Sequence, residues 1–430
     1  MDGKEQRNRE LIVGYDLCDN YSQISYFNYE QAEPKTISIM TGEEKYQIPT
    51  ILLKKEGVDK WYFGEDAQKK VVDEAFIIKN IVSRCRNEET SVIEGIEFKP
   101  EDLLEIFLKK TFNFFDYEGL SSKIPDIIVF TVENINDNLV RAIKLSAKAI
   151  GIKNENIYIQ DHEDSFVEYS IHQKKELWNY KVILLEYTKE SFKALNLKIN
   201  TKTTPVIATI DKKEFSSITS PQTMFVTDTI EVKNSKLDVL IRDTLKNYFG
   251  KEMISCIFLC GECFDGDWFK ETLRLLCSGR RVFQGKNLFT KGACYQAAKK
   301  VIQSDLEDHL FLGNNKLKFN VGLDVFYKGE SQYYSMILAS ENWYDAHGEC
   351  ELILDNESCV ELICTPIDNK DTRSIIVKLH ELPDRPNKTI RICVQVRFES
   401  AKFGKVTIKD LGFGEFYESS GKTWNHEICL

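Results

Sequence analysis

The sequence predicts a mixed α/β fold in which one strand-and-helix block occurs twice and is followed by an antiparallel β domain. A pair of strands followed by alternating helices and strands extends over residues 11–175, and the same order returns over 181–305. Beyond about residue 317, helical periodicity disappears and apolar and polar residues alternate. Because 430 residues exceed the usual size of one domain, we expect three parts, residues 1–180, 181–316 and 317–430.

The first block starts with a hairpin and continues with helices and strands. An apolar run leads from Leu11 to Asp16, turn-forming residues follow at 18–20, and a strand pattern returns at 22–27. Apolar stripes predict helices over 100–115 and over 136–150, the second ending at Gly151. Strands are expected over 126–132 and 156–160. The carboxylate of Asp16 is therefore expected at the mouth of the hairpin.

The second block has the same order of elements without an obvious repeat of sequence. Strands are expected over 181–186 and 192–199, followed by a helix over 237–249. A strand over 254–260 ends at Gly261, and helices are predicted over 268–277 and 292–303. The two blocks predict two similar halves, each a sheet flanked by helices, with a central cleft between them.

The third part reads as an antiparallel β domain. From Ile390 to Phe398 the apolar residues alternate strictly with polar ones, which indicates a strand with one buried face. A turn is predicted at Phe403-Gly404, and Val406 begins the next strand. The same alternation at 360–364 predicts a further strand.

Composition excludes several classes of protein. Apolar residues make up 42% and charged residues 29% of the chain, which is an ordinary globular balance. The net charge of −10 disfavours binding to nucleic acid. No apolar run reaches the length that a membrane helix needs, and the charged segment Met1 to Glu10 does not have the pattern of a secretory signal. We therefore expect a cytoplasmic protein without a membrane partner.

The twelve cysteines are scattered, and many lie in apolar runs, as is usual in a reducing compartment. Cys260 and Cys263 form a C-x-x-C pair with Cys256 and Cys277 nearby, but no second pair follows. We expect neither a disulfide nor a zinc site there. The six histidines lack metal-site spacing, and no nucleophile elbow or Walker loop is present.

Several short segments stand in a characteristic order along the chain, at residues 16–22, 63–67, 79–84, 127–151, 160–166, 186–192, 260–261 and 291–293. In this order and spacing they resemble the nucleotide-binding motifs of the actin, sugar-kinase and heat-shock-chaperone superfamily, and of DnaK-like chaperones in particular. Residues 321–324 and 391–410 resemble the entry and the closing hairpin of the chaperones' substrate-binding β-sandwich. We expect that family's helical lid to be absent, since the sequence printed here ends at Leu430.

The resemblance implies a duplicated actin-like (ribonuclease H-like) two-lobed ATPase fold followed by a β-sandwich domain. It implies that Asp16 holds a metal-bound water and that Lys79 contacts the γ-phosphate. The matching motif positions give candidate catalytic residues Asp16, Lys79, Asp161 and Glu186, and candidate cofactor-binding residues Ser22, Ser191, Gly261 and Gly292. These side chains are expected to converge on the cleft, with Gly261 and Gly292 on its opposite wall. A functional cleft would take ATP or ADP with magnesium.

The two phosphate loops depart from the family pattern. Glycines let backbone N–H groups approach phosphate closely, but here Cys18 and the three residues Thr188, Lys189 and Glu190 replace them. Asp19, Glu186 and Glu190 also bring carboxylates toward a polyanion. Like charges ~4 Å apart repel by about 4 kcal/mol at an effective dielectric constant near 20. We therefore expect an eroded cleft with no cofactor and no metal, in which the remaining carboxylates belong to turns or are solvated.

Three functions compete at this point. The first is a chaperone-like binding or scaffolding protein with an eroded, non-hydrolysing nucleotide cleft. The second is a slow, divergent ATP-dependent chaperone or actin-like ATPase, and the third is a small-molecule kinase, which would not have this terminal β domain. The first predicts a protein or peptide partner bound from about Leu317 onward, without control by nucleotide. The alternative role for the β domain is contact with the rest of the chain or with a second copy, giving a homo-oligomer.

Overall fold

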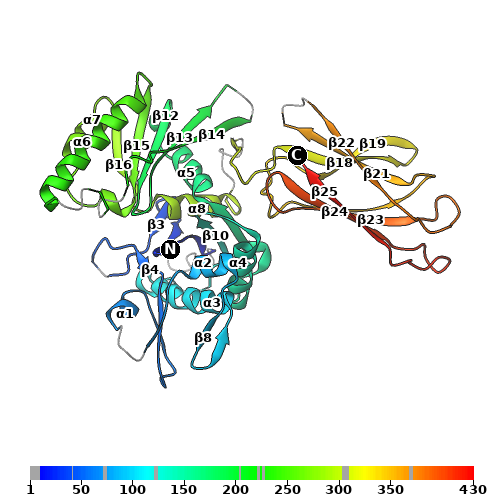
Figure 1. Ribbon diagram of the computed structural model, residues 1–430, viewed down its shortest axis with the longest axis horizontal. Helices are drawn as coiled ribbons and strands as arrows, with labels where there is room; N and C mark the ends of the chain where they lie inside the picture. Colours follow the sequence, from blue (N-terminus) through cyan, green and yellow to red (C-terminus); the bar gives the residue numbers. More distant parts are fainter. Residues whose placement is uncertain are drawn as a thin grey trace, which may run out of the picture. The chain divides into compact units, whose positions relative to one another are not determined.

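The computed structural model describes residues 10–40, 42–70, 75–120, 124–202, 205–219, 223–224, 228–302, 309–367 and 371–430 (Figure 1). Residues 1–9 of the charged N-terminal segment lie outside this range. The chain forms two compact units, Met1–Phe311 and Leu312–Leu430. Each unit is described separately below.

The first sheet of the larger unit is six-stranded. Its strands are β1 (Ile12–Leu17), β2 (Tyr21–Asn28), β3 (Glu33–Thr36), β4 (Ile48–Pro49), β10 (Ile127–Val132) and β11 (Ile157–Asp161). They are ordered β11-β10-β1-β2-β3, and β4 pairs with β2 outside this path. β10 pairs parallel with β1, and β11 pairs parallel with β10. β2 pairs antiparallel with β1, and β3 pairs antiparallel with β2. Every residue of β1 and β10 is buried, which explains their nearly continuous apolar sequence.

The second sheet has the same arrangement. Its strands are β12 (Lys181–Tyr187), β13 (Phe192–Asn200), β14 (Val206–Glu214), β15 (Ile254–Cys260), β16 (Arg281–Gln284) and β17 (His309–Phe311). They are ordered β16-β15-β12-β13-β14-β17. β12, β13 and β14 form an antiparallel meander. On the other side of β12, β15 pairs parallel with β12 and β16 pairs parallel with β15, as β10 and β11 do beside β1 in the first sheet. The repeated block of the sequence is therefore a repeat of strand order.

Two helices exchange places between the sheets. α5 (His162–Ile171) follows the first sheet in sequence but packs on the second, where Phe166 and Val167 join the buried cluster of Leu184 and Leu195. α8 (Leu288–Lys299) follows the second sheet and packs on the first, where Ala293 and Ala297 meet Ile12 and Val129. In Figure 1 both helices lie between the two sheets. Each half of the unit thus completes the core of the other.

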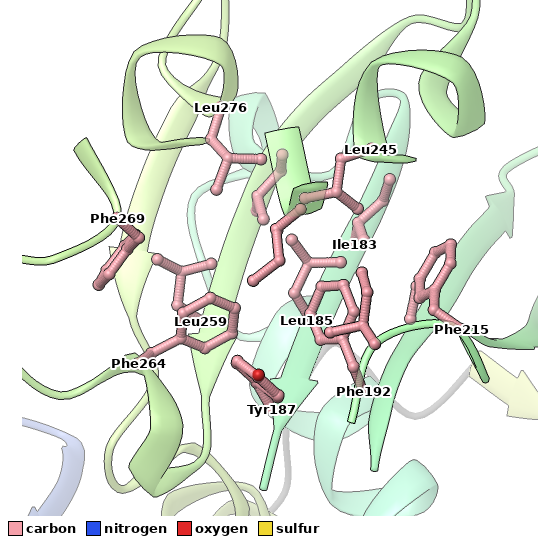
Figure 2. Close-up of a cluster of buried hydrophobic side chains, with 14 of the residues drawn as sticks. Ile183, Leu185, Tyr187, Phe192, Phe215, Leu245, Leu259, Phe264, Phe269 and Leu276 are labelled. Atoms are coloured by element: carbon pink, nitrogen blue, oxygen red, sulfur yellow. The ribbon is translucent and has the colours of Figure 1, made fainter. Parts of the chain in front are cut away.

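The outer faces of both sheets are covered by helices. α6 (Ile230–Phe249) and α7 (Lys270–Leu276) cover the second sheet. Figure 2 shows Leu245 and Leu276 facing the strand residues Ile183 and Leu259. On the first sheet, α3 (Pro100–Thr111) lies beside Tyr15, whose hydroxyl is 3.0 Å from Thr111 Oγ1, and α4 (Asp137–Ala149) packs against α3.

A segment of small elements connects β4 to α3. It contains α1 (Gly64–Lys69), α2 (Ile81–Asn87), a three-stranded sheet ordered β6-β5-β7 and a hairpin of β8 and β9. Their bounds are β5 (Leu52–Lys55), β6 (Trp61–Phe63), β7 (Ala75–Ile78), β8 (Ser91–Ile93) and β9 (Ile96–Phe98). α2 packs against α3 and α4 and thereby joins this segment to the first sheet.

The smaller unit consists of two four-stranded antiparallel sheets, ordered β19-β18-β21-β22 and β20-β23-β24-β25. Their bounds are β18 (Phe319–Tyr327), β19 (Glu330–Ile337), β20 (His347–Ile353), β21 (Cys359–Pro366), β22 (Arg373–Lys378), β23 (Arg391–Phe398), β24 (Phe403–Asp410) and β25 (Thr423–Cys429). The inward residues of β23 and β24, such as Val394 and Ile408, are fully buried. The predicted β-rich C-terminal region and the mixed α/β class are confirmed.

Three local expectations differ from the structure. The predicted turn at Phe403-Gly404 is wrong, because both residues begin β24 and Gly404 pairs with Phe398. A Cβ at Gly404 would lie 2.8 Å from the Phe398 ring, so the glycine makes room for a neighbouring side chain across the strands. α6 begins at Ile230 rather than 237. α8 begins at Leu288 rather than 292, and residue 303 of the expected helix lies outside the described residues.

Candidate functional site

A cavity of about 560 Å³ opens where the two sheets of the larger unit approach each other. Asp16 at the end of β1 and Glu186 near the end of β12 both line it, and these are equivalent positions in the two sheets. Gly261, directly after β15, lines it as well. Three of the eight sequence-predicted site residues therefore meet at this cavity.

The remaining five candidates are not among the residues that line the cavity. Lys79 is exposed after β7. Asp161 is buried at the end of β11, where its carboxylate caps α5 by accepting from the N–H of Asp164 at 2.8 Å. Ser22 is fully buried, with its hydroxyl 2.9 Å from that of Thr50. Ser191 is half-buried in the turn between β12 and β13.

Gly292 lies inside α8, where it allows close contact between two helices. A Cβ on this residue would lie 1.9 Å from the carbonyl oxygen of Ser165 in α5. Gly261 has a similar steric reason, because its φ is +96° and a Cβ would lie 2.2 Å from the carbonyl oxygen of Tyr187. Packing alone therefore requires glycine at both positions.

The buried carboxylate of Asp16 is the centre of a small polar cluster. His162 Nε2 lies 2.9 Å from Asp16 Oδ1, and the Cys18 thiol donates to the same oxygen at 3.4 Å. Cys18 Sγ is also 3.8 Å from His162 Nε2. His162 is the first residue of α5, and its ring stacks on Phe289 of α8 at 4.0 Å between centroids. The cluster thus joins β1, its following turn and both exchanged helices.

The local charges affect the ionisation of this cluster. Burial lowers the pKa of His162, but the carboxylates of Asp16, Glu186 and Glu133 outweigh burial and raise it. Burial, and next to it the charge of Asp16, raises the pKa of the Cys18 thiol well above its usual value. In the absence of a bound cation, Cys18 is therefore a protonated thiol and His162 is readily protonated.

Glu186 is held by a cation from the protein itself. Lys193 on β13 lies 2.9 Å from Glu186 and 3.0 Å from Glu133. Burial alone would lower the pKa of Lys193, but the two carboxylates raise it. Glu133 shows the opposite shift: its pKa is lowered, because Lys193 outweighs burial. Lys193 therefore stays charged and bridges the first and second sheets at the cavity.

The second candidate phosphate loop, residues 188–191, is closed by its own hydrogen bonds. The N–H of Thr188 donates to the carbonyl of Ser191 at 2.9 Å. Those of Glu190 and Ser191 donate to the Thr188 hydroxyl, each at 3.2 Å. The N–H of Lys189 donates to the Glu262 carboxylate at 3.0 Å. All four backbone donors of this loop thus have acceptors within the protein.

The first candidate loop is also tied to its surroundings. The N–H of Cys18 donates to the carbonyl of Tyr21 at 3.2 Å, which closes the turn between β1 and β2. The carboxylate of Asp19 accepts from the backbone N–H of Ser83 at 2.9 Å and from its hydroxyl at 2.5 Å. Asp19 therefore anchors the first turn of α2, and it is not among the residues that line the cavity.

Sequence reasoning missed three residues of the site: His162, Lys193 and Glu133. Glu133 and His162 lie inside the recognised segments 127–151 and 160–166, and Lys193 directly follows the segment 186–192. Their roles depend on partners that are distant in sequence, since His162 and Asp16 are 146 positions apart. A charged residue directly inside an otherwise apolar strand, such as Lys193, was the available signal.

The cysteines of the C-x-x-C pair belong to packing. Each of the twelve cysteines is a free thiol. Cys260 and Cys263 are both buried, and the Cys260 thiol donates to the carbonyl of Gly285 at 3.2 Å. Among the described residues, the cluster with metal-ligand geometry is Asp16, Cys18 and His162.

None of the helices in the described parts of the chain has the length and apolar character needed to cross a membrane.

The smaller unit has a groove of about 1060 Å³ lined by residues of β18, β20 and β21. Exposed aromatic side chains lie along it, with Phe326 77% and Tyr327 55% exposed. Five carboxylates also line it, those of Asp324, Glu351, Asp355, Glu357 and Glu361. Among the described residues of this lining Lys388 is the basic side chain, and it pairs with Asp355 at 3.1 Å. The groove is therefore acidic and aromatic.

The division into two units agrees with comparisons to protein families. Residues 33–314, roughly two thirds of the chain, match the model described as "Family of unknown function (DUF5716) C-terminal". Residues 316–430 match a second model, "Domain of unknown function (DUF8552)". No curated protein matches the chain. The first match contains the whole second sheet and the first sheet from β3 onward, whereas β1 and β2, with Asp16, precede it. The chain belongs to the DUF5716 C-terminal family.

Proposed function

We propose that this protein is an actin-like, chaperone-related binding or scaffolding protein whose nucleotide cleft does not hydrolyse ATP. The observation that supports this most directly is the closed loop 188–191. A phosphate cradle needs free backbone N–H groups, and here all four are already bonded within the protein. Opening the loop for phosphate would break these bonds and bring the Glu190 carboxylate close to a polyanion.

The charges at the cavity support the same conclusion. In a hydrolytic site, carboxylates at the positions of Asp16 and Glu186 would be free to orient a metal-bound water. Here Glu186 is paired with Lys193, and Asp16 accepts hydrogen bonds from Cys18 and faces His162. A nucleotide with magnesium would have to compete with these internal partners.

The actin-like assignment is supported by topology. Two sheets with the same strand order, each with three antiparallel strands followed by two parallel ones, are what a duplicated ribonuclease H-like fold requires. The exchanged helices α5 and α8 between them are consistent with two lobes that flank a cleft. Fold alone does not give function, so the proposal depends on the chemistry of the cavity and of the groove.

The partner that best fits the groove of the smaller unit is an extended basic segment of another protein. Its exposed aromatic side chains offer apolar contact and stacking for Arg or Lys. Of its five carboxylates, Asp355 pairs with Lys388 and Glu351 pairs with Arg391, and the lining still carries an excess of negative charge. β19 and β20 are edge strands of their sheets, to which an extended chain can add by backbone hydrogen bonds.

The first experiment titrates the full chain with ATP and with ADP, each with magnesium, by calorimetry, and then measures phosphate release. We expect no binding up to about 1 mM nucleotide and no phosphate release above a buffer blank. Binding in the micromolar range contradicts the proposal as stated.

A second candidate function, a slow ATPase, is favoured by the size of the cavity and by Lys45, Lys189 and Lys286 in its lining. The slow-ATPase function would be supported if the unmodified chain releases phosphate from ATP and the Asp16→Asn variant does not. A rate unchanged by this substitution would instead indicate a contaminating ATPase.

The second experiment measures binding of labelled extended peptides to the full chain by fluorescence anisotropy. Peptides that alternate Arg or Lys with Leu should bind, and the same peptides with Glu in the basic positions should not. Glu361→Lys in the groove should weaken binding by about tenfold, whereas Glu427→Lys on β25, outside the groove, should leave it unchanged. ATP should have no effect. Equal binding by both variants, or a shift on adding ATP, contradicts the assignment.

A further inference from the structure

Three different metal-ligand atoms meet at the end of β1. They are Asp16 Oδ1, Cys18 Sγ and His162 Nε2, separated by 2.9 Å (O to N), 3.4 Å (S to O) and 3.8 Å (S to N). Zinc–ligand bonds of about 2.0–2.3 Å with tetrahedral angles place ligand atoms about 3.3–3.6 Å apart. Each observed separation is within about 0.4 Å of these values. The three atoms thus nearly form one face of a zinc coordination tetrahedron.

The backbone holds these ligands in place without a metal. Asp16 lies inside the first sheet, paired with Gln23 on β2 and Thr131 on β10. Cys18 lies in the closed turn after β1, and the His162 ring stacks on the nearly parallel ring of Phe289, with 6° between the two planes. Metal sites require this kind of preorganisation, since ordering flexible ligands costs conformational entropy.

The surrounding charge favours a cation. Asp16, Glu186 and Glu133 supply three carboxylates around the cluster, and all three act on His162. Lys193 offsets the charge of Glu186 and Glu133 in part. A divalent ion bound here would add positive charge beside these carboxylates and would take the place of any proton on His162 Nε2.

We propose that Asp16, Cys18 and His162 bind one zinc ion, with the fourth coordination position left to water or another ligand. A thiolate, an imidazole and a carboxylate together are the donor set that zinc accepts, whereas magnesium and calcium prefer oxygen ligands alone. Binding displaces the Cys18 thiol proton and any proton on His162 Nε2 to solvent, so the ion replaces the hydrogen bonds of the metal-free cluster. Zinc would then lock β1 to α5, which packs on the second sheet.

The proposal is tested on the full chain with zinc alone, in the absence of nucleotide. Protein stripped with a chelator is titrated with Zn²⁺ against a chromophoric competitor, and separately with Co²⁺. We expect one zinc per chain and a thiolate-to-cobalt charge-transfer band. Cys18→Ser should abolish that band, and Cys18→Ser and His162→Gln should each weaken zinc binding by at least about 100-fold.

The matched control is Cys277→Ser, which removes an exposed cysteine outside the cluster and should bind zinc like the unmodified chain. Zinc that is substoichiometric, or retained by Cys18→Ser, overturns the proposal, as does loss of zinc in Cys277→Ser. The cobalt spectrum is recorded on the unmodified chain, so absence of the band refutes the proposal even if a ligand variant fails to fold. This failure would be independent of the nucleotide assays.

Discussion

Replacing Lys193 by Met is the substitution that most directly tests how the cavity is held together. Met keeps much of the length and apolar volume of the side chain but removes its charge. Lys193 lies 2.9 Å from Glu186 and 3.0 Å from Glu133, and its own side chain is 22% exposed. The substitution removes the cation paired with Glu186, whose side chain is 11% exposed.

The expected loss of stability follows from how exposed each pair is. Removing one partner of a buried ion pair typically costs about 3–5 kcal/mol, but solvent reduces this figure for Lys193. The pair with Glu133 contributes little, because Glu133 is 51% exposed and exposed pairs are worth about 0–1 kcal/mol. We therefore expect Lys193→Met to lower the free energy of unfolding of the larger unit by about 2 kcal/mol.

The assay is equilibrium unfolding in urea, with separate transitions for the two units where they are resolved. Glu186→Gln and the double variant complete a double-mutant cycle, and the double variant should be more stable than Lys193→Met, because its carboxylate is gone. Lys198→Met is the matched control on the same strand. Its pair with Asp211 is 55% and 69% exposed, so the change should be below about 0.5 kcal/mol.

Two results would refute this reasoning. If Lys193→Met unfolds at the same urea concentration as Lys198→Met, the pair at the cavity contributes nothing beyond a surface pair. If the effects of Lys193→Met and Glu186→Gln simply add, the two side chains are not coupled, and the cavity carboxylate is stabilised by something other than Lys193.

Four further predictions concern other parts of the molecule. Arg385 and Asp410 form a bidentate pair at 3.0 Å with side chains 6% and 0% exposed, so Arg385→Met should destabilise the smaller unit by about 3 kcal/mol in urea unfolding. Burial raises the pKa of Asp410, but hydrogen bonds from Arg385 and neighbouring donors outweigh burial and lower it from 3.8 to about 2. The ionised Asp410 therefore stabilises the fold above pH 3.8, and this contribution is lost as the pH falls toward 2. Asp410→Asn should remove this part of the acid transition in tryptophan fluorescence. Gly292→Ala should lower the stability of the larger unit by about 1–3 kcal/mol, because the added Cβ overlaps the Ser165 carbonyl, and an unchanged melting temperature would show that α5 and α8 separate easily. Thr188→Ala removes the acceptor of two loop N–H groups and should cost about 1 kcal/mol, without creating nucleotide affinity in the calorimetric titration.

Periodicity in the sequence was enough to place most of the regular elements. Strands expected over 126–132 and 254–260 occur as Ile127–Val132 and Ile254–Cys260, because a fully buried strand is an apolar run bounded by polar residues. The alternation from Ile390 to Phe398 likewise gives β23. These signals are local, since each strand or helix must present its apolar side to a core whatever that core contains.

Glycine positions show where local reading is insufficient. Gly404 was read as a turn, but it lies in β24 because the ring of Phe398 occupies the space of its Cβ. Gly292 matched a nucleotide motif, yet its neighbour is the backbone of Ser165 in α5. A glycine in the sequence indicates either that a neighbouring group occupies the space of its Cβ or that its φ is positive. The tertiary structure is needed to tell which of the two reasons applies.

The sequence alone determined the two-fold order of elements, the β domain and the carboxylates at the ends of two equivalent strands. It did not determine what those carboxylates contact. His162 reaches Asp16, and Lys193 reaches both Glu186 and Glu133, only because α5 packs on the opposite sheet and brings the two halves together. Ionic and hydrogen-bonded partners depend on distances of a few ångströms between residues far apart in sequence, and the tertiary structure alone sets those distances.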